Sequence, residues 1–197
     1  MKQECLMPTL TDNFMKQTML VQHIVTERLL LRPLELSDAT TIEHLAGDPL
    51  ISMWTSSFTT PFSHQQSIRW VNNSIIAMNS GYSIILAITV KKRRHLIGVV
   101  SLRFSENEIP QLGYWLGTEY QGKGYCTEAV NAVIEYGFDQ LELPEIMARC
   151  ADNNTASKGV MLRCGMQKIM ETPSIKIIKD IPVALISYSK KHPTQSG

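Results

Sequence analysis

The stretch from residue 111 to residue 139 constrains the fold of this chain more than any other. It reads QLGYWLGTEYQGKGYCTEAVNAVIEYGFD, which is an alternating apolar run, a glycine-rich turn and an apolar pattern of helical period. Glycines at a strand-to-helix junction let the main chain approach a bulky ligand, and the N–H groups of the first helical turn have no partners of their own. This arrangement predicts a phosphate-binding site at the start of the helix.

Two familiar phosphate-binding motifs do not fit this turn. A Walker A loop requires Ser or Thr after its lysine, but Gly124 follows Lys123. A dinucleotide-binding fingerprint requires a third glycine where Thr127 stands. Because a glycine turn before a helix is often a simple connection, its meaning depends on the rest of the chain.

The remaining patterns predict an α/β domain on a mixed sheet. Helices are expected over about 39–46, with Ser37 or Asp38 as N-cap, from Ser63 to 79–81, after the glycine-rich turn, and over 156–165. Strands are expected at 29–31, 82–90, 95–105, 111–117, 145–151 and in the apolar runs near 175–188. The stretch Trp54–Phe62 is predicted to be a loop with exposed aromatic side chains.

Composition and charge exclude several classes of function. The chain carries 19 Lys+Arg and 18 Asp+Glu, a formal net charge of +1, so no nucleic-acid-binding surface is indicated. Four cysteines stand far apart without a CxxC pair, which predicts neither a metal site nor a disulfide framework. Residues 1–24 lack the continuous apolar segment of a signal peptide, and no stretch approaches membrane-spanning length. We therefore expect a cytoplasmic protein without a nucleic-acid or membrane partner.

The length of 197 residues suits one domain. We predict an N-terminal extension over residues 1–24, the domain itself over residues 25–191 and a C-terminal tail over residues 192–197. The acting form is expected to be a monomer or a homodimer.

Two motifs resemble those of the GNAT superfamily of N-acetyltransferases. The acetyl-CoA loop of that family has the pattern Q/R-x-x-G-x-G/A, whose three fixed positions are occupied here by Gln121, Gly124 and Cys126. Cys126 is a departure, since the family has Gly or Ala there. The segments GYWLGTEYQGKGYCTEA and NNTASKGVMLRCGM resemble the RimJ/RimL-type branch, which acetylates N-terminal amines of ribosomal proteins. The likeness runs from Thr26 to about Lys190.

The resemblance implies a GNAT fold, in which a mostly antiparallel central sheet splays at the acetyl-CoA site and is flanked by helices. It assigns cofactor contacts to the turn, namely Gln121, Gly122, Lys123, Gly124, Tyr125, Cys126 and Thr127, and to Asn154 and Ser157. The pantetheine arm would pair with the splayed strand edge near 115–117. A backbone N–H of Trp115 or Leu116 would stabilise the oxyanion, and the Ser157 hydroxyl would assist the departing thiolate.

The general base is not identified by the sequence. Relatives often have an acidic residue on the fourth strand, where Gln111 stands here, and Glu106 and Glu108 are alternatives in a solvated loop. His64 fits the start of a helix better than a catalytic base. Trp54 and Trp70 fit the core or the pocket wall better than a substrate-stacking role.

These observations predict an N-acetyltransferase that moves the acetyl group of acetyl-CoA directly to a primary amine. The expected acceptor is a protein N-terminal α-amine of the ribosomal-protein type. Two alternatives are a small-amine acetyltransferase, acting on a polyamine or an aminoglycoside, and a CoA-binding module without turnover. An acidic acceptor pocket would favour the small amine.

Overall fold

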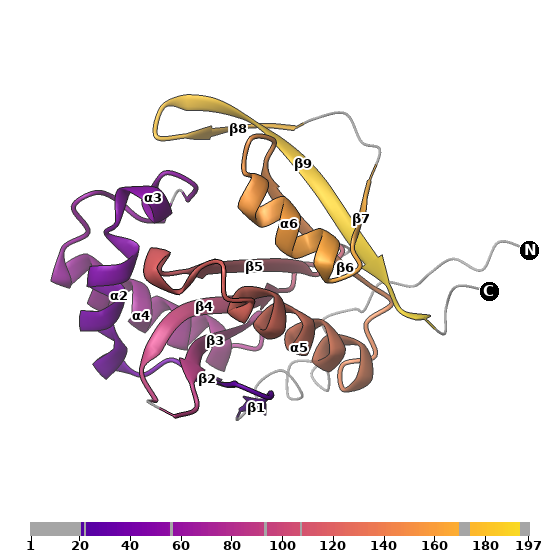
Figure 1. Ribbon diagram of the computed structural model, residues 1–197, viewed down its shortest axis with the longest axis horizontal. Helices are drawn as coiled ribbons and strands as arrows, with labels where there is room; N and C mark the ends of the chain where they lie inside the picture. Colours follow the sequence, from indigo (N-terminus) through magenta and orange to yellow (C-terminus); the bar gives the residue numbers. More distant parts are fainter. Residues whose placement is uncertain are drawn as a thin grey trace, which may run out of the picture.

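The computed structural model describes residues 21, 23–55, 57–92, 94–106, 108–169 and 174–193. These residues form a nine-stranded sheet with the strand order β1-β2-β3-β4-β5-β6-β9-β7, and β8 pairs with β9 (Figure 1). The strands are β1 Ile24–Val25, β2 Leu29–Pro33, β3 Ser83–Val90, β4 Leu96–Arg103, β5 Gln111–Leu116, β6 Glu145–Ala151, β7 Gln167–Lys168, β8 Ser174–Ile178 and β9 Ile181–Lys191. The helices are α2 Ala39–Ala46, α3 Pro49–Ser52, α4 His64–Asn79, α5 Tyr125–Asp139 and α6 Thr155–Arg163, with short 3-10 turns η1 Leu36–Asp38 and η2 Thr118–Tyr120.

The sheet divides between β5 and β6. All other strand pairs are antiparallel, whereas β5 and β6 are parallel and pair only at Gln111 with Met147 and Leu112 with Ala148. On its other edge β5 stays paired with β4 as far as Leu116 opposite Gly98. The carboxyl ends of β5 and β6 therefore part from each other, which is the predicted splay.

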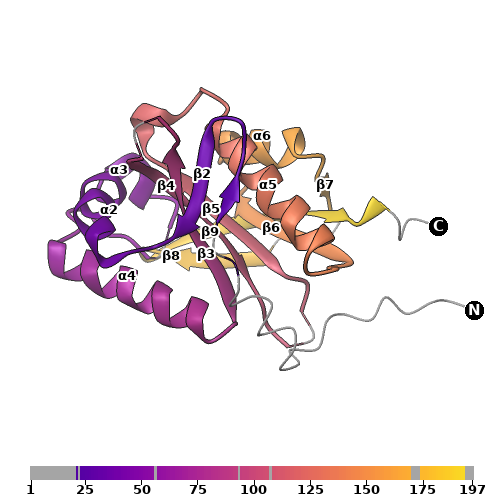
Figure 2. The same ribbon diagram turned by 90° about the horizontal axis from the view of Figure 1, so that it is seen from below.

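Helices cover both faces of the sheet (Figure 2). Apolar side chains of α5 and of the turn after it lie in one large core with one face of β3, β4 and β5: Val130, Val133, Ile134, Phe138 and Leu141. The helices α2 and α4 pack on the opposite face, where Ile42 and Val71 are completely buried. The predicted mixed α/β fold is thus confirmed. None of the helices in the described part of the chain has both the length and the apolar character needed to cross a membrane.

The expectation of exposed aromatic side chains between Trp54 and Phe62 is wrong. Phe58 and Phe62 are only 2% and 6% exposed. The Phe58 ring lies 5.2 Å from that of Phe62, 5.4 Å from that of Trp70 and 5.5 Å from that of Trp115, measured between centroids. The Ser, Thr and Pro content of the segment predicts irregular backbone, but irregular backbone can still place aromatic rings in a core.

The expected end of the first helix is also the start of another. Asp48 is the N-cap of α3 and accepts a hydrogen bond from the Leu50 N–H at 2.8 Å, and Pro49 occupies the first turn of that helix. Asp followed by Pro fits a helix start as well as a helix stop, because the missing N–H of Pro is not needed there. At the N-terminus, β1 and the buried Val21 show that the last residues of the predicted extension belong to the folded part. Residues 1–20 lie outside the described part.

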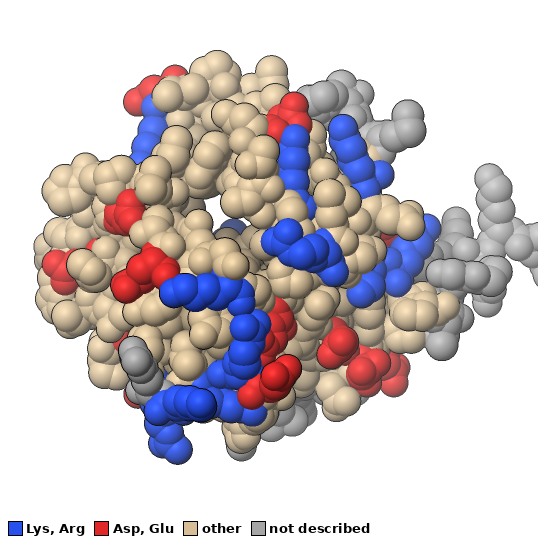
Figure 3. All heavy atoms as spheres, viewed as in Figure 1, with Lys and Arg blue, Asp and Glu red and all other residues tan. Residues whose placement is uncertain are grey.

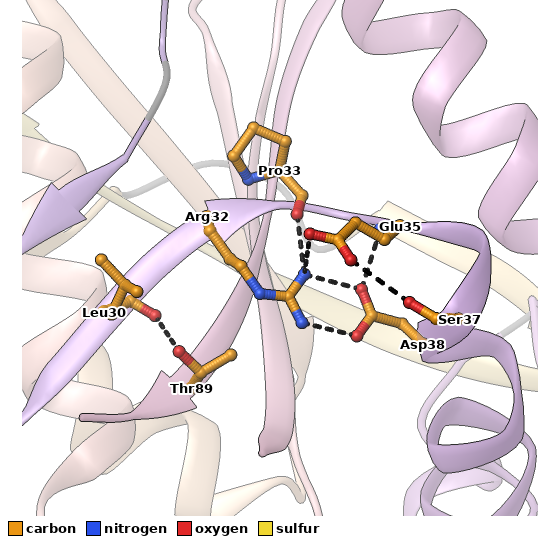
Figure 4. Close-up of polar contacts among 7 residues, drawn as sticks. All are labelled: Leu30, Arg32, Pro33, Glu35, Ser37, Asp38 and Thr89. Carbon is orange, nitrogen blue, oxygen red and sulfur yellow. Dashed lines mark hydrogen bonds and ion pairs between the residues drawn. The ribbon is translucent and has the colours of Figure 1, made fainter. Parts of the chain in front are cut away.

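A largely buried ion pair joins β2 to η1 (Figure 4). The Arg32 guanidinium donates to both carboxylate oxygens of Asp38, at 2.8 Å from Nη1 and 2.7 Å from Nη2. The same carboxylate accepts a hydrogen bond from the Glu35 N–H at 2.8 Å. The hydrogen bond with Asp38 raises the pKa of Arg32, so the guanidinium stays charged although its side chain is only 21% exposed. This pair fixes the path of the chain into α2.

We expect Asp38→Ala to lower the free energy of unfolding by about 2 kcal/mol, because it leaves the Arg32 charge without its partner and removes an acceptor of a backbone N–H. Urea denaturation followed by circular dichroism measures the change. Glu35→Gln is the control, since its carboxylate is 65% exposed and 3.9 Å from Arg32, and it should change stability by less than about 0.5 kcal/mol. Equal effects of the two substitutions would contradict the assigned role of Asp38.

Candidate active site

A cavity of about 700 Å³ opens where β5 and β6 part. Its walls come from α3, the second halves of β5 and β6, the turn before α5 and the first turns of α6. The space-filling view shows the molecule hollowed near the middle of this face (Figure 3). Ligands of open α/β sheets bind at the carboxyl ends of strands where the sheet changes its connection pattern. This cavity is therefore the candidate active site.

The cavity brings together all but one of the residues predicted from the sequence. Its lining includes Trp115, Leu116, Gln121, Gly122, Gly124, Tyr125, Cys126, Thr127, Asn154 and Ser157. Lys123 is the exception, because its ammonium group is turned back over η2. It donates to the Glu119 carbonyl oxygen at 2.8 Å and lies 5.9 Å from the centroid of the Tyr120 ring.

The glycine-rich turn has the geometry of an anion-binding loop. Gly122 and Gly124 have φ angles of 73° and 78°, in the left-handed region that favours glycine. Gly124 is the N-cap of α5 and supplies no side-chain cap, so the N–H groups of the first helical turn remain available at its positive end. Around Gly122 no atom lies within 4 Å of the place where a Cβ would be, so a large group has room to approach the backbone.

Arg28 supports this turn from outside the cavity. Its Nη1 donates to the Lys123 carbonyl oxygen at 2.9 Å, and its Nε pairs with Glu128 Oε2 at 2.6 Å. The guanidinium also lies 4.6 Å from the centroid of the Tyr125 ring. These contacts hold the turn in shape before any ligand binds. No sequence motif points to Arg28, because it is far from the turn along the chain.

The ladder between β4 and β5 determines which backbone donor faces the cavity. The Gly117 N–H donates to the Ile97 carbonyl oxygen at 2.9 Å, and donors of an antiparallel strand alternate in direction. The Trp115 N–H therefore points to β4, whereas the Leu116 N–H points to the edge that β6 has left. The Leu116 carbonyl oxygen points the same way, because it accepts a hydrogen bond from Gln121 Nε2 at 2.9 Å.

Ser157 is held in the cavity by two hydrogen-bonding partners. Asn154, the N-cap of α6, accepts a hydrogen bond from the Ser157 N–H at 3.0 Å. Tyr114 Oη donates to the Ser157 carbonyl oxygen at 3.0 Å and lies 2.9 Å from Ser157 Oγ. Burial raises the pKa of Tyr114 above its ordinary value, so its phenol stays protonated. No sequence pattern points to this contact, because Tyr114 and Ser157 are far apart in the chain.

Comparison with known proteins identifies the family of the chain. Residues 28–167 match the family model of the acetyltransferase (GNAT) domain. The chain is a GNAT acetyltransferase. An uncharacterized N-acetyltransferase, p20, of Bacillus licheniformis is 32% identical over 75% of the chain and 84% of its own length. The ribosomal-protein-serine acetyltransferase of Escherichia coli is 30% identical over 51% of the chain and 64% of its own length.

Solved structures agree with this assignment. The crystal structure of the microcin C7 self-immunity acetyltransferase in complex with acetyl-CoA and AMP has a TM-score of 0.76 and 25% identity, and covers 84% of the chain and 93% of its own length. The acetyl donor of this GNAT acetyltransferase is acetyl-CoA. The turn fits the pyrophosphate of that molecule, because its glycines leave the backbone accessible and the start of α5 presents unpaired N–H groups. The resemblance to the RimJ/RimL-type branch is supported by the ribosomal-protein relative.

Cys126 replaces the small residue of the family pattern in this acetyltransferase. Burial raises the pKa of its thiol to about 12, with the thiol of Cys164 as a further cause. A cysteine with such a pKa is a thiol throughout the physiological range, and the thiol is a poor nucleophile. Cys126 is therefore a wall residue of the turn.

We expect Cys126→Ala to keep at least half of the wild-type kcat/KM for acetyl-CoA, because Ala also fits the family pattern and no covalent step needs the sulfur. Steady-state kinetics measures this. Intact mass spectrometry of the wild-type protein during turnover is the control, and an acetyl group on Cys126 would contradict the assignment.

The positions considered for a general base lie away from the cavity. Gln111 begins β5, opposite Arg103 and Met147, about 17 Å along the strand from Leu116. Glu106 and Glu108 are exposed near the same end of the strand. His64 Nδ1 lies 2.7 Å from Glu43 Oε2, which agrees with a role at the start of a helix. Trp54 lines the cavity and Trp70 packs in the aromatic cluster, as predicted.

Proposed function

We propose that this GNAT acetyltransferase transfers the acetyl group of acetyl-CoA directly to the α-amine at the N-terminus of a protein. The observation that carries the proposal is the cavity at the splay, which combines an anion-binding turn, a free backbone donor at Leu116 and a hydroxyl at Ser157. The Escherichia coli relative, a ribosomal-protein-serine acetyltransferase, supports this acceptor class. A cytoplasmic location and action as a monomer or homodimer belong to the same proposal.

Three parts of the cavity serve cofactor binding, stabilisation of the oxyanion and departure of the thiolate. The turn with Gly122 and Gly124 holds the pyrophosphate of acetyl-CoA, and Asn154 contacts its pantetheine arm. The Leu116 N–H stabilises the negative charge that grows on the thioester oxygen when the amine attacks. Ser157 then donates a hydrogen bond to the departing thiolate, and the single proton of the Tyr114 phenol is shared between the Ser157 carbonyl oxygen and Ser157 Oγ, at 3.0 and 2.9 Å.

The chemistry of the amine fits a site without an acidic base. An α-amine with a pKa of about 8 is roughly one tenth neutral at pH 7, whereas a lysine amine with a pKa near 10.4 is neutral in less than about one part in a thousand. The described residues that line the cavity include no Asp, Glu or His. An α-amine therefore needs less assistance here than a lysine side chain.

The same lining disfavours a polyamine or an aminoglycoside as acceptor. A polycation is bound by carboxylates, and the only ionisable groups with a full charge among the described lining residues are Arg149 and Arg163. An acidic pocket was the feature expected of a small-amine acetyltransferase. The charge of the described lining therefore favours the protein N-terminus.

The test uses three peptides with amidated C-termini that differ only in their amines. The first has a free N-terminus and no lysine, the second has a blocked N-terminus and an internal lysine, and the third has neither amine. Acetyl transfer from acetyl-CoA, followed by mass spectrometry, should occur only on the first. Spermidine and kanamycin serve as small-amine acceptors. Faster transfer to either of these, or to the internal lysine, would contradict the proposal.

A further inference from the structure

Arg149 stands at the point where the sheet divides. It follows Ala148, the last residue of β6 that pairs with β5, and it lines the cavity. Its neighbours Ala148 and Cys150 are buried in the core beneath α5 and α6. Because side chains alternate along a strand, Arg149 lies on the opposite face. Trp115, which packs with the core beneath α2 and α4, lies on that face too.

This position separates Arg149 from the groups that serve acetyl-CoA. The glycine-rich turn and Ser157 belong to the side of the sheet covered by α5 and α6. At the other end of the cavity the walls are Leu50, Ile51 and Trp54, from α3 and the residues after it. That end of the cavity is therefore open to a ligand other than the one held by the turn.

The Arg149 guanidinium has no acidic partner among the residues that the structure describes. Arg149 Nη2 donates a long hydrogen bond to the sulfur of Met147 at 3.9 Å. The Lys179 ammonium lies near the same end, since it donates to Ser52 Oγ in α3 at 3.1 Å, but it does not line the cavity and the Asp48 carboxylate caps the same helix. The charge of the described lining comes from Arg149 and Arg163. Charge of one sign in a cavity with apolar walls attracts a ligand group of the opposite sign.

We propose that the acceptor carries an anionic group, a carboxylate or a phosphate, close to its amine, and that Arg149 binds it. This inference rests on the proposed function, because it assumes that an amine enters the cavity beside Arg149. A guanidinium binds a carboxylate or a phosphate through two parallel hydrogen bonds, which also orient the ligand. In a protein acceptor the group is an acidic side chain at the second or third residue; in a small acceptor it is a phosphate ester.

The experiment compares matched acceptors that differ in one charge. The peptides Ser-Glu-Ala-Ala, Ser-Gln-Ala-Ala and Ser-Lys-Ala-Ala, all as C-terminal amides, test the carboxylate. O-phosphoserine amide and serine amide test the phosphate. For the wild-type enzyme, kcat/KM should be about tenfold to a hundredfold higher for the anionic member of at least one set, as expected for a hydrogen bond between charged groups.

The variants assign this preference to one side chain. Arg149→Gln should abolish it, and Arg149→Glu should reverse it in favour of the lysine peptide. Arg69→Gln is the matched control, because Arg69 is exposed on α4 and does not line the cavity, and it should keep the wild-type preference. The dissociation constant of acetyl-CoA, measured by calorimetry, should stay within about twofold in all three variants.

Each result decides the question. Equal loss of kcat/KM for all acceptors in Arg149→Gln, or no preference in the wild type, overturns the inference. If acetyl-CoA binds but no acceptor is acetylated, the proposed function fails. Calorimetric binding of the same peptides and amides to the CoA-loaded protein then tests Arg149 alone: a preference for the anionic ligand that Arg149→Gln removes supports the inference, and equal binding overturns it.

Discussion

Gly124→Asp is expected to weaken the binding of acetyl-CoA at least a hundredfold while the fold persists. Gly124 precedes the first turn of α5, where unpaired N–H groups and the helix dipole attract the pyrophosphate. A carboxylate at this position puts a negative charge against another negative charge. Asp tolerates the φ angle of 78° better than most residues, so little of the effect should come from the backbone. Calorimetry with acetyl-CoA measures the change.

The control for this substitution is Gly124→Asn, which has nearly the same shape and no charge. A Cβ at this position meets Arg28 Nη2 at 3.2 Å, so both variants push on the arginine that supports the turn. The difference between the two variants is therefore the effect of the charge, and it should account for at least tenfold of the loss. Equal affinities of Asp and Asn would mean that the turn does not hold the pyrophosphate. The melting temperatures of both variants show whether the fold is intact.

Local patterns were enough to predict the elements that position the cofactor. The strand EIMARCA is β6, from Glu145 to Ala151, because it is a short run rich in apolar residues, and the helix over residues 39–46 is α2, because a capping residue precedes it and Gly47 follows it. The glycine-rich turn was also predicted from residues close together in the chain, since glycine adopts left-handed φ angles with the least strain. These features depend on residues that are close together in the chain.

Features that depend on distant residues were not predictable from such patterns. Arg28 supports a turn that begins more than 90 positions later in the chain. The Tyr114 phenol meets Ser157 only because β5 and α6 lie on opposite walls of one cavity. The burial of Phe58 likewise requires Trp115, which belongs to another element. Sequence reasoning predicted the glycine-rich turn because that turn is local, and it left the acceptor side of the cavity open because several elements build it.

The sequence also could not show whether the backbone N–H of Trp115 or that of Leu116 faces the cavity. The sequence assigned the backbone donor to this pair and left the two alternatives open. Strand register decides between them, because the direction of an N–H alternates along β5 and the hydrogen bond from Gly117 to Ile97 fixes the phase. That hydrogen bond joins two strands, so no pattern within either strand contains the information. We therefore propose Leu116 as the donor.

Ser157→Ala should lower kcat by about tenfold to a hundredfold and leave the affinity for acetyl-CoA nearly unchanged. The hydroxyl assists the thiolate only as the C–S bond breaks, so its loss affects the transition state and not the bound ground state. The leaving thiol has a pKa near 8.5 and departs readily at neutral pH, which keeps the loss at or below the lower end of general-acid effects. Steady-state kinetics with the best acceptor gives kcat and KM separately.

Two control variants distinguish catalysis from positioning at Ser157. Asn154→Ala should instead raise KM for acetyl-CoA and cost about 1 kcal/mol of stability, because Asn154 caps α6 and lines the cavity. Tyr114→Phe removes only the phenol that contacts Ser157 Oγ, so it should lower kcat in the same way as Ser157→Ala, but less. In the double variant the two losses should not add, because the phenol acts through Ser157. If Ser157→Ala changes only KM, the hydroxyl is structural and another group or water protonates the thiolate.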